Sequence, residues 1–217
     1  MKSFTITICA IILVSCAGKN DISYYQSLDF YAMRSEGTLT LLEKFKTYQQ
    51  TTSVTCGPSC ALMLLTYFGQ SDGYDEMTLK ALRGTSQDTT YLRHLLTVFD
   101  AAGKFDCKST FDYEPDEITP ALLLSFLKEG FPVIVGTNEW GGHWQIIIGY
   151  DTMGTETTSD DVLILADPYD RTDHTEDGYI VYPFENFYDG TWRNYYDPDF
   201  KWGLFLVARP NDPSNRK

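Results

Sequence analysis

A cysteine stands directly before a predicted helix in the segment Gln49–Gly69, QQTTSVTCGPSCALMLLTYFG. Pro58 suits the first turn of a helix, where its missing N–H costs nothing, and the run that follows is apolar enough for a buried helix. A helix N-terminus carries partial positive charge and free N–H groups, which favour the thiolate form of a cysteine. Cys56 is therefore a candidate nucleophile, with disulfide partner, metal ligand and core residue as the alternatives.

His143 is the candidate base for this thiol, because it follows two glycines and opens a predicted strand in NEWGGHWQIIIGYD. The next predicted strand lies in the segment DVLILADP and ends at Asp167. The two strands can form a hairpin around residue 155. In a hairpin the first residue of one strand lies beside the last residue of the other, so we expect Asp167 within reach of His143. A carboxylate there can hold the imidazole tautomer. Asp151 ends the strand that His143 begins, roughly 25 Å away, which excludes it from this role.

Gln50 lies six positions before Cys56. Acyl transfer places negative charge on a carbonyl oxygen, and this charge needs hydrogen-bond donors that are fixed in advance. The backbone N–H of Cys56 and the side-chain amide of Gln50 can supply them, with Gln49 as the competing residue. The residues around His143 are candidates for a substrate cleft, or for simple packing in the case of the tryptophans: Trp140, Gly141, Gly142 and Trp144.

The rest of the chain predicts helices first and strands afterwards. Apolar residues at helical spacing predict helices within 75–84, 89–103 and 116–130, in addition to the helix after Cys56. β-Branched and aromatic runs predict strands within 104–113, 132–137, 143–151, 161–167, 178–184 and 202–208. Residues 38–50 fit either a strand or a short helix. A helical half followed by an antiparallel sheet is an α+β organisation.

Composition narrows the class of protein. The 217 residues suggest one domain with decorations, and 43% hydrophobic with 15% aromatic residues is enough for a sizeable core. A formal net charge of −13 disfavours nucleic-acid binding. His94 is expected on the solvated side of its helix and His174 in an acidic loop. The spacing of cysteines and histidines does not fit a zinc site, so no metal is expected.

The N-terminus resembles that of a bacterial lipoprotein. Lys2 precedes the apolar run Phe4–Val14, which has the length of a signal peptide and is too short to span a bilayer. LVSC resembles the lipobox, in which the cysteine, here Cys16, is lipidated and becomes the mature N-terminus; an ordinary signal peptide or a strand is the alternative. We expect a signal peptide at 1–15, a tether and lead-in at 16–44, the domain at 45–208 and a tail at 209–217.

Once the signal peptide is removed and Cys16 is lipidated, an odd number of cysteines remains: Cys56, Cys60 and Cys107. In an exported protein, an odd number of cysteines suggests a free reactive thiol. Cys60 lies one helical turn after Cys56, and we expect it to be a small core residue. If Cys60 instead pairs with Cys107, Cys56 is the cysteine left over. If nothing pairs, all three are thiols.

The ordered motifs resemble the papain-like cysteine peptidases, and most of all the double-glycine (bacteriocin-leader) peptidase-like domains. The pattern of those domains falls here on Gln50, Cys56–Pro58, Gly142–Trp144, Gly149–Asp151 and Asp167–Pro168. The resemblance implies a papain-like α+β fold, with the catalytic cysteine at a helix N-terminus packed on a C-terminal antiparallel sheet, and a short helix ending in Trp192. It also implies that Cys56 is the nucleophile, His143 the base and acid, Asp167 its orienting partner and Gln50 the oxyanion donor.

The expected function is that of an exported, lipid-anchored cysteine hydrolase cleaving a peptide or isopeptide-like amide through an acyl-enzyme. Leader-processing relatives are usually fused to a transporter, which these residues do not contain, so we do not expect a double-glycine leader as substrate. Phytochelatin synthases share the nucleophile pattern, and a peptidyl- or acyl-transferase is an alternative, as is an inactive surface-binding module. The expected partners are a peptide or protein substrate and a membrane, through lipid on Cys16. No cofactor is required.

Overall fold

The computed structural model describes residues 28–171, 175–193, 203–212 and 214. Its centre is an antiparallel sheet of seven strands in the order β2-β7-β3-β4-β5-β6, with β1 also paired to β4. The strands are β1 Leu39–Leu41, β2 Phe105–Ser109, β3 Val133–Thr137, β4 His143–Asp151, β5 Val162–Ala166, β6 Tyr179–Pro183 and β7 Phe205–Pro210. The helices are α1 Cys56–Tyr67, α2 Glu76–Leu82, α3 Leu92–Ala102 and α4 Pro120–Lys128, with short helical turns η1 Thr110–Asp112, η2 Glu139–Gly141 and the π-helical η3 Asn186–Trp192.

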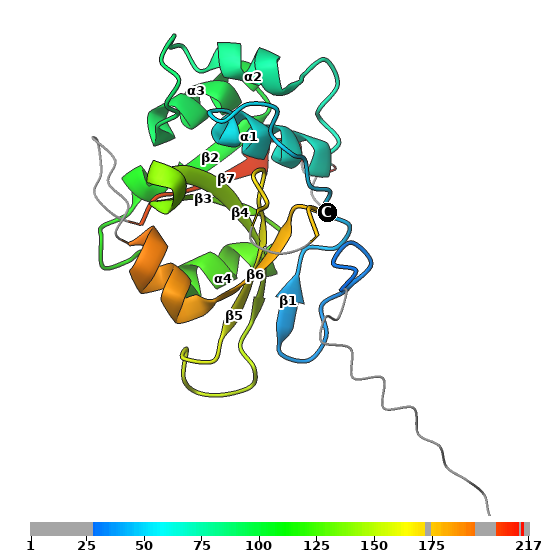
Figure 1. The fold of residues 1–217 in the computed structure, drawn as a ribbon, viewed down its shortest axis with the longest axis vertical. Coiled ribbons are helices and arrows are strands. Elements are labelled where there is room, and N and C mark those ends of the chain that lie inside the picture. Colours follow the sequence, from blue (N-terminus) through cyan, green and yellow to red (C-terminus); the bar gives the residue numbers. More distant parts are fainter. Residues whose placement is uncertain (1–27, 172–174, 194–202, 213, 215–217) are drawn as a thin grey trace, which may run out of the picture.

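The helices form two groups around the sheet. Figure 1 shows α1, α2 and α3 together on one side of it, and α4 and η3 on the other. The expected α+β fold, with N-terminal helices packed on an antiparallel sheet, is confirmed. The helical half also contributes β1 and β2, so the sheet is not built from the second half alone.

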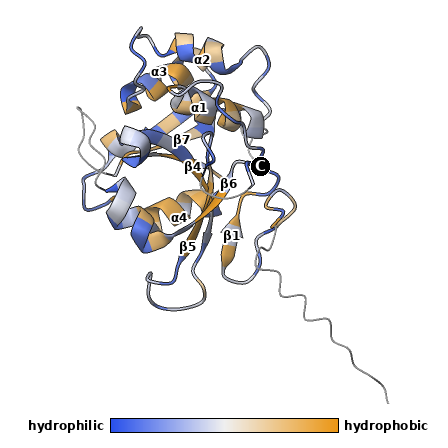
Figure 2. Cartoon of the chain, viewed as in Figure 1, coloured by the Kyte–Doolittle hydropathy of each residue, from blue (hydrophilic) through white to orange (hydrophobic). Residues whose placement is uncertain are grey.

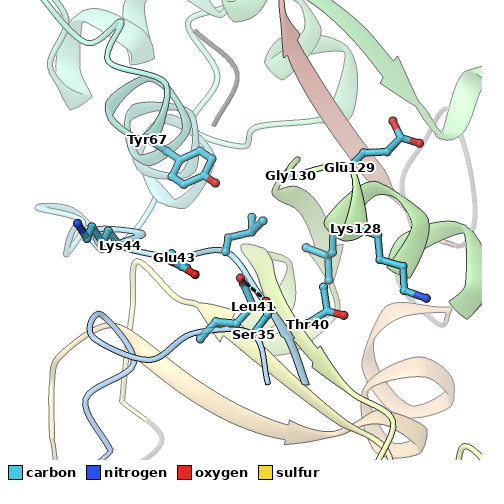
Figure 3. A pocket seen from close by; sticks show the side chains of 11 residues that line it. Ser35, Thr40, Leu41, Glu43, Lys44, Tyr67, Lys128, Glu129 and Gly130 are labelled. Atoms are coloured by element: carbon cyan, nitrogen blue, oxygen red, sulfur yellow. Dashed lines mark hydrogen bonds between the residues drawn. The ribbon is translucent and has the colours of Figure 1, made fainter. Parts of the chain in front are cut away.

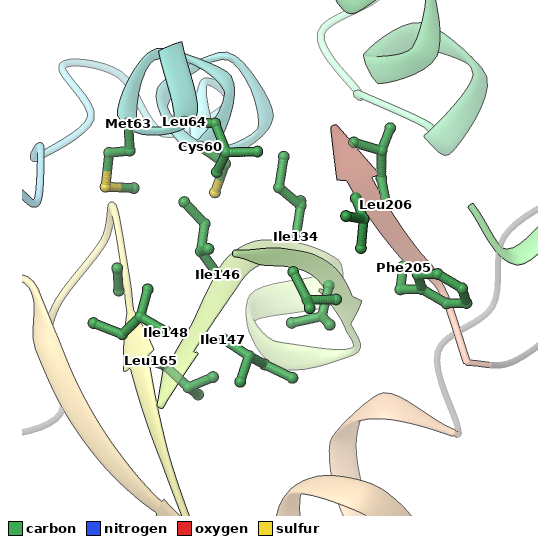
Figure 4. Packing of buried hydrophobic residues seen from close by; sticks show 14 of the residues in the cluster. Cys60, Met63, Leu64, Ile134, Ile146, Ile147, Ile148, Leu165, Phe205 and Leu206 are labelled. Carbon is green, nitrogen blue, oxygen red and sulfur yellow. The ribbon is translucent and has the colours of Figure 1, made fainter. Parts of the chain in front are cut away.

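The core lies on both faces of β4, whose residues are buried from His143 to Tyr150. Figure 4 shows Ile146 directed toward Cys60 on α1, while Ile147 points to the opposite side. Alternation of side chains along the strand therefore supplies apolar residues to two layers at once. In Figure 2 the hydrophobic residues gather on the sheet and the hydrophilic ones in the outer loops.

Local signals explain where the helices begin. Asp75 caps α2 by accepting a hydrogen bond from the backbone N–H of Thr78 at 2.7 Å, and Thr119 caps α4 in front of Pro120. In α3 the N-cap residue is Tyr91, and His94 completes a capping box, because its Nδ1 accepts from the backbone N–H of Tyr91 at 3.1 Å. The expectation that His94 is solvated was wrong, because capping draws the ring in and leaves the residue only 8% exposed.

The packed unit begins before residue 45, earlier than expected. Residues 39–41 form a strand on β4, and the backbone N–H of Leu42 extends this pairing to the carbonyl of Ile148 at 2.8 Å. Phe30 and Leu41 belong to the buried core. At the other end β7 continues through Pro210, which pairs with Phe105. Residues 1–27, with the expected signal peptide and Cys16, and His174 lie outside the described residues.

No helix among the residues with described positions is long and apolar enough to cross a bilayer.

Candidate active site

Cys56 is the first residue of α1 and is half-buried, at the end of the helix that carries the positive dipole charge. The first turn of α1 contains no acidic residue that would oppose a thiolate. The preceding residue, Thr55, closes the entry loop, because its hydroxyl donates to the carbonyl of Thr52 at 3.1 Å. The sulfur is thus presented on a fixed helix end.

The two other cysteines of the described chain are inert by comparison. Both are free thiols, so the Cys60–Cys107 disulfide considered from the sequence is not formed. Burial raises the pKa of Cys60 well above its ordinary value, with the charges of Cys56 and Asp167 adding to the effect. Burial likewise raises the pKa of Cys107 to about 12. Cys60 donates to the carbonyl of Trp144 at 3.2 Å and is a core residue, as expected.

His143 and Asp167 meet at the end of the sheet next to this helix terminus. His143 Nε2 lies 2.6 Å from Asp167 Oδ1, and both residues are buried. The same carboxylate oxygen accepts from the backbone N–H of Tyr169 at 2.7 Å. Burial raises the pKa of Asp167, but hydrogen bonds from His143 and Gln145 outweigh it and hold the pKa below its usual value. The carboxylate is therefore ionised at neutral pH.

The pairing register differs from the expected hairpin. Ile146 of β4 faces Ala166 of β5, so Asp167 follows on beside Gln145 and not beside His143. A register shift between Ile147 and Gly149 accompanies this offset. The carboxylate still reaches His143, because His143 and Gln145 point to the same face of the strand.

His143 also senses the neighbouring thiol. Since Nε2 faces Asp167, Nδ1 is the nitrogen left for the sulfur of Cys56. Burial lowers the pKa of His143, but the side chains of Asp167 and Cys56 outweigh it and raise the pKa to about 10. The order carboxylate, imidazole and thiol is the one that an activated cysteine nucleophile requires.

Gln50 lies near the site but its amide is engaged elsewhere. Its backbone N–H donates to the carbonyl of Pro168 at 2.7 Å, which joins it to the residue after Asp167. Its side-chain Nε2 donates to the carbonyl of Thr52 at 2.7 Å, and its buried Oε1 has no hydrogen-bond partner. Gln49 is exposed. The oxyanion role of Gln50 stays a prediction.

A cleft of about 180 Å³ opens at Cys56. The four cleft residues predicted from the sequence all line it, together with the entry loop and a segment between α2 and α3: Ser53, Val54, Asp88, Thr89, Thr90, Trp140, Gly141, Gly142 and Trp144. Trp140 is 66% exposed and adopts the left-handed φ of 55°, which costs energy for a residue other than glycine. Trp144 is buried and donates to the carbonyl of Thr90 at 2.7 Å.

Several residues of the site escaped the sequence reasoning. Gln145 is fully buried and its Nε2 donates to Asp167 Oδ2 at 2.8 Å. Its position two residues after His143 on a predicted strand is the signal that could have found it. Tyr169 places its ring edge-on against His143, with centroids 6.4 Å apart, and Trp140 packs edge-on against Tyr169 at 5.8 Å. These aromatic contacts shield the imidazole from water.

Glu76 was also missed, although it fixes the loop that enters Cys56. It is buried at the start of α2, and its carboxylate accepts from the backbone N–H of Thr51 at 2.9 Å and from the Tyr48 hydroxyl at 3.2 Å. Burial raises the pKa of Glu76, but hydrogen bonds from Thr55 and Thr51 outweigh it and lower the pKa. Nothing in the spacing of the sequence distinguishes this glutamate from a solvated one.

A second and larger cavity of about 620 Å³ lies between β1 and the ends of α1 and α4. Figure 3 shows the Tyr67 ring directed into it, while the charged ends of Lys44 and Lys128 point away. Neither Cys56 nor His143 lines this cavity, so it is not the place for the chemistry described above. Within the described residues no cluster of three or more histidine, cysteine or acidic side chains is arranged to hold a metal ion.

Comparisons with known proteins agree with this fold. The model of the Peptidase_C39 like family matches residues 42–199. The peptidase domain of Streptococcus ComA, described as a bi-functional ABC transporter involved in a quorum sensing pathway, has a similar fold with a TM-score of 0.53 and 18% identity. That match covers 77% of this chain and 99% of the ComA domain. The peptidase domain of Streptococcus mutans ComA gives a TM-score of 0.42 and 16% identity, covering 76% and 100%. A search of curated proteins finds no match.

Proposed function

This chain belongs to the Peptidase C39 like family, and we propose that it is a cysteine peptidase acting through Cys56, His143 and Asp167. The observation that carries the proposal is the position of one imidazole. His143 is hydrogen-bonded to Asp167 through Nε2, and Cys56 is near enough to help raise the pKa of the same imidazole. Cysteine hydrolases need this order of groups, because the imidazole must receive the thiol proton while a carboxylate fixes its orientation.

In the proposed reaction the Cys56 thiolate attacks the carbonyl carbon of a peptide or isopeptide-like amide. The C–N bond then breaks, and the imidazolium of His143 gives its proton to the departing amine. Water, deprotonated by the neutral imidazole, attacks the thioester and releases the acid and the free enzyme. The backbone N–H of Cys56 and the amide of Gln50 are the proposed oxyanion donors; Gln50 must turn its Nε2 away from Thr52 to serve.

The cleft places the acyl part of the substrate. His143, which must protonate the leaving amine, is not among the residues that line the cleft with Cys56. We therefore place the acyl side in this cleft, which is lined by the Asp88–Thr90 segment and by Trp140–Gly142.

Cleavage of a mixed peptide library tests the proposal. The wild-type protein is expected to yield new N-termini that Cys56→Ser and His143→Ala do not yield, while Cys60→Ser, at the buried core cysteine, retains activity. Peptides released with an added amine on the new C-terminus instead of a carboxylate would identify the transferase alternative. If the folded wild-type protein neither cleaves peptides nor transfers them, the proposal is contradicted and the inactive surface-binding module is the alternative that remains.

The lipid anchor is proposed from the N-terminal segment alone. We expect Cys16 to carry lipid, so that the domain works at the cell envelope. Incorporation of labelled fatty acid into the wild-type protein, lost in Cys16→Ser, supports this. Equal labelling of both proteins contradicts it.

A further inference from the structure

Arg83 is a buried cation beside the proposed catalytic cleft. It follows the last residue of α2 and is 1% exposed. Among the described residues, its guanidinium donates to neutral groups alone: the carbonyls of Lys80 (3.0 Å), Gln87 (2.7 Å), Asp88 (3.0 Å) and Thr89 (3.3 Å), and the hydroxyl of Thr90 (2.7 Å). The Asp88 carboxylate pairs with Lys80 instead, at 3.2 Å. Within the part of the chain that the structure describes, Arg83 therefore has its hydrogen bonds satisfied without a contacting counter-charge.

These hydrogen bonds fix one wall of the cleft. Residues Asp88–Thr90 line the cleft together with Trp140, and all three are hydrogen-bonded to Arg83. The carbonyl of Thr90 is also held by Trp144. The guanidinium group carries five N–H donors that point in different directions, so a single arginine can bind several carbonyl groups of one loop.

Thr90 joins this cation to the helix that bears the thiol. Its hydroxyl contacts Arg83, and its methyl group lies 2.6 Å from where a Cβ on Gly57 would stand. Gly57 directly follows Cys56, so the Thr90 side chain contacts the guanidinium through its hydroxyl and lies against the first turn of α1 through its methyl group. In a buried setting a positive charge stabilises a nearby anion appreciably.

The charge of Arg83 is coupled to the cysteine. Burial lowers the pKa of Arg83, while the negative charges of Asp88 and Cys56 raise it. The other titratable groups around the first turn are His143 from β4 with its partner Asp167, Cys60 on α1, and Glu76, which holds the entry loop at Thr51. Arg83 and His143 are the cations in this set, and they approach the sulfur from different elements. A buried charge without a paired anion is costly, and a thiolate at Cys56 relieves that cost.

We infer that Arg83 is a positioning residue of the site, resting on the proposed function: it holds the Asp88–Thr90 wall against α1, and its charge favours the thiolate of Cys56. Two substitutions distinguish the role of the charge from the role of the hydrogen bonds. Arg83→Lys keeps the charge and loses the fork, whereas Arg83→Met loses both.

Alkylation of Cys56 by iodoacetamide, followed by mass spectrometry from about pH 5 to 9, measures the thiolate. We expect Arg83→Met to react about tenfold more slowly than wild type at about pH 6 and equally fast at about pH 9. Arg83→Lys should keep most of the rate at low pH. Hydrogen exchange of the amides of residues 87–90 should accelerate in both variants. Arg34→Met, the same change at an exposed site, is the control and should match wild type.

The possible outcomes distinguish a failure of the proposed function from a failure of the Arg83 inference. A wild-type profile identical to that of a simple thiol contradicts the proposed function and the charge role together. An enhanced wild-type reactivity that Arg83→Met retains at low pH, with the fold intact by circular dichroism, overturns only the Arg83 inference. If Arg83→Met does not fold, Arg83→Gln keeps donors without charge and is expected to show the same loss at low pH.

Discussion

Gln145 Nε2 donates to Asp167 Oδ2 at 2.8 Å, while the other oxygen of that carboxylate contacts His143. Both carboxylate oxygens are thereby occupied, and the carboxylate cannot rotate away from the imidazole. Because Gln145 and His143 lie on one face of β4, a single strand presents both the proposed base and the side chain that holds the Asp167 carboxylate in place.

Removing the Gln145 amide should weaken the fold and the site. We expect Gln145→Leu to lower the free energy of unfolding by about 1–3 kcal/mol, because a buried carboxylate oxygen is left without a donor. Urea unfolding measures this, and peptide cleavage should fall in parallel. An unchanged unfolding midpoint with full activity contradicts the role assigned to Gln145.

The His143–Asp167 pair should stabilise the protein only below a defined pH. The pKa of His143 is raised to about 10 in the folded state from an unfolded value of about 6.5. A raised pKa contributes stability that is fully present below the unfolded pKa and is lost as the pH rises through the folded one. The stability difference between wild type and His143→Gln is therefore expected to be largest near pH 6 and to shrink toward pH 10. Thermal unfolding across this range measures it, and a difference that grows with pH contradicts it.

Glu76 should act in the opposite pH range. The pKa of Glu76 is lowered in the folded state. Its contribution to the free energy of unfolding is therefore present above the pKa of the unfolded chain, about 4.3, and is lost as the pH falls through the folded pKa. Wild type should exceed Glu76→Gln in stability at neutral pH, and the two should converge below about pH 4. A stability gap that persists under acid would show that the Glu76 charge does not hold the Thr51 loop.

Gly57 should not tolerate a side chain. A Cβ there would lie 2.6 Å from the Thr90 methyl group, so Gly57→Ala is expected to displace the cleft wall and cost about 1–3 kcal/mol. Thr90→Ser removes that methyl group and keeps the hydroxyl, so the double variant should recover stability. Gly190→Ala, where nothing lies within 4 Å of the added Cβ, is the matched control and should change stability by less than about 0.5 kcal/mol. Equal effects at both glycines would contradict the close packing.

The sequence predicted those parts of the fold that depend on local periodicity. Helices after Cys56 and Pro120, and the strand from His143, follow from apolar spacing and caps. The proximity of His143 and Asp167 was predicted, but the register was not, because the prediction took the hairpin as symmetric about residue 155. Gly149 inside the strand was the available sign of the irregularity between Ile147 and Gly149. His94 was misplaced because a capping hydrogen bond, not helical periodicity, decides its burial.

Long-range contacts account for what sequence reasoning missed at the site. Arg83 and Glu76 stand at opposite ends of α2 and hold the two loops that flank Cys56. Their partners are backbone atoms, which are the same for every sequence, so residue types carry no sign of the pairing. Only the folded chain shows that α2 connects both loops.

The ultraviolet absorbance of the Cys56 thiolate tests the central claim most directly. The difference between wild type and Cys56→Ser at about pH 6, where an ordinary thiol is protonated, reports any thiolate at Cys56 in the protein at rest. We predict that the thiolate band is present in wild type and absent in His143→Ala. A band that appears only above about pH 8 in wild type would contradict the account.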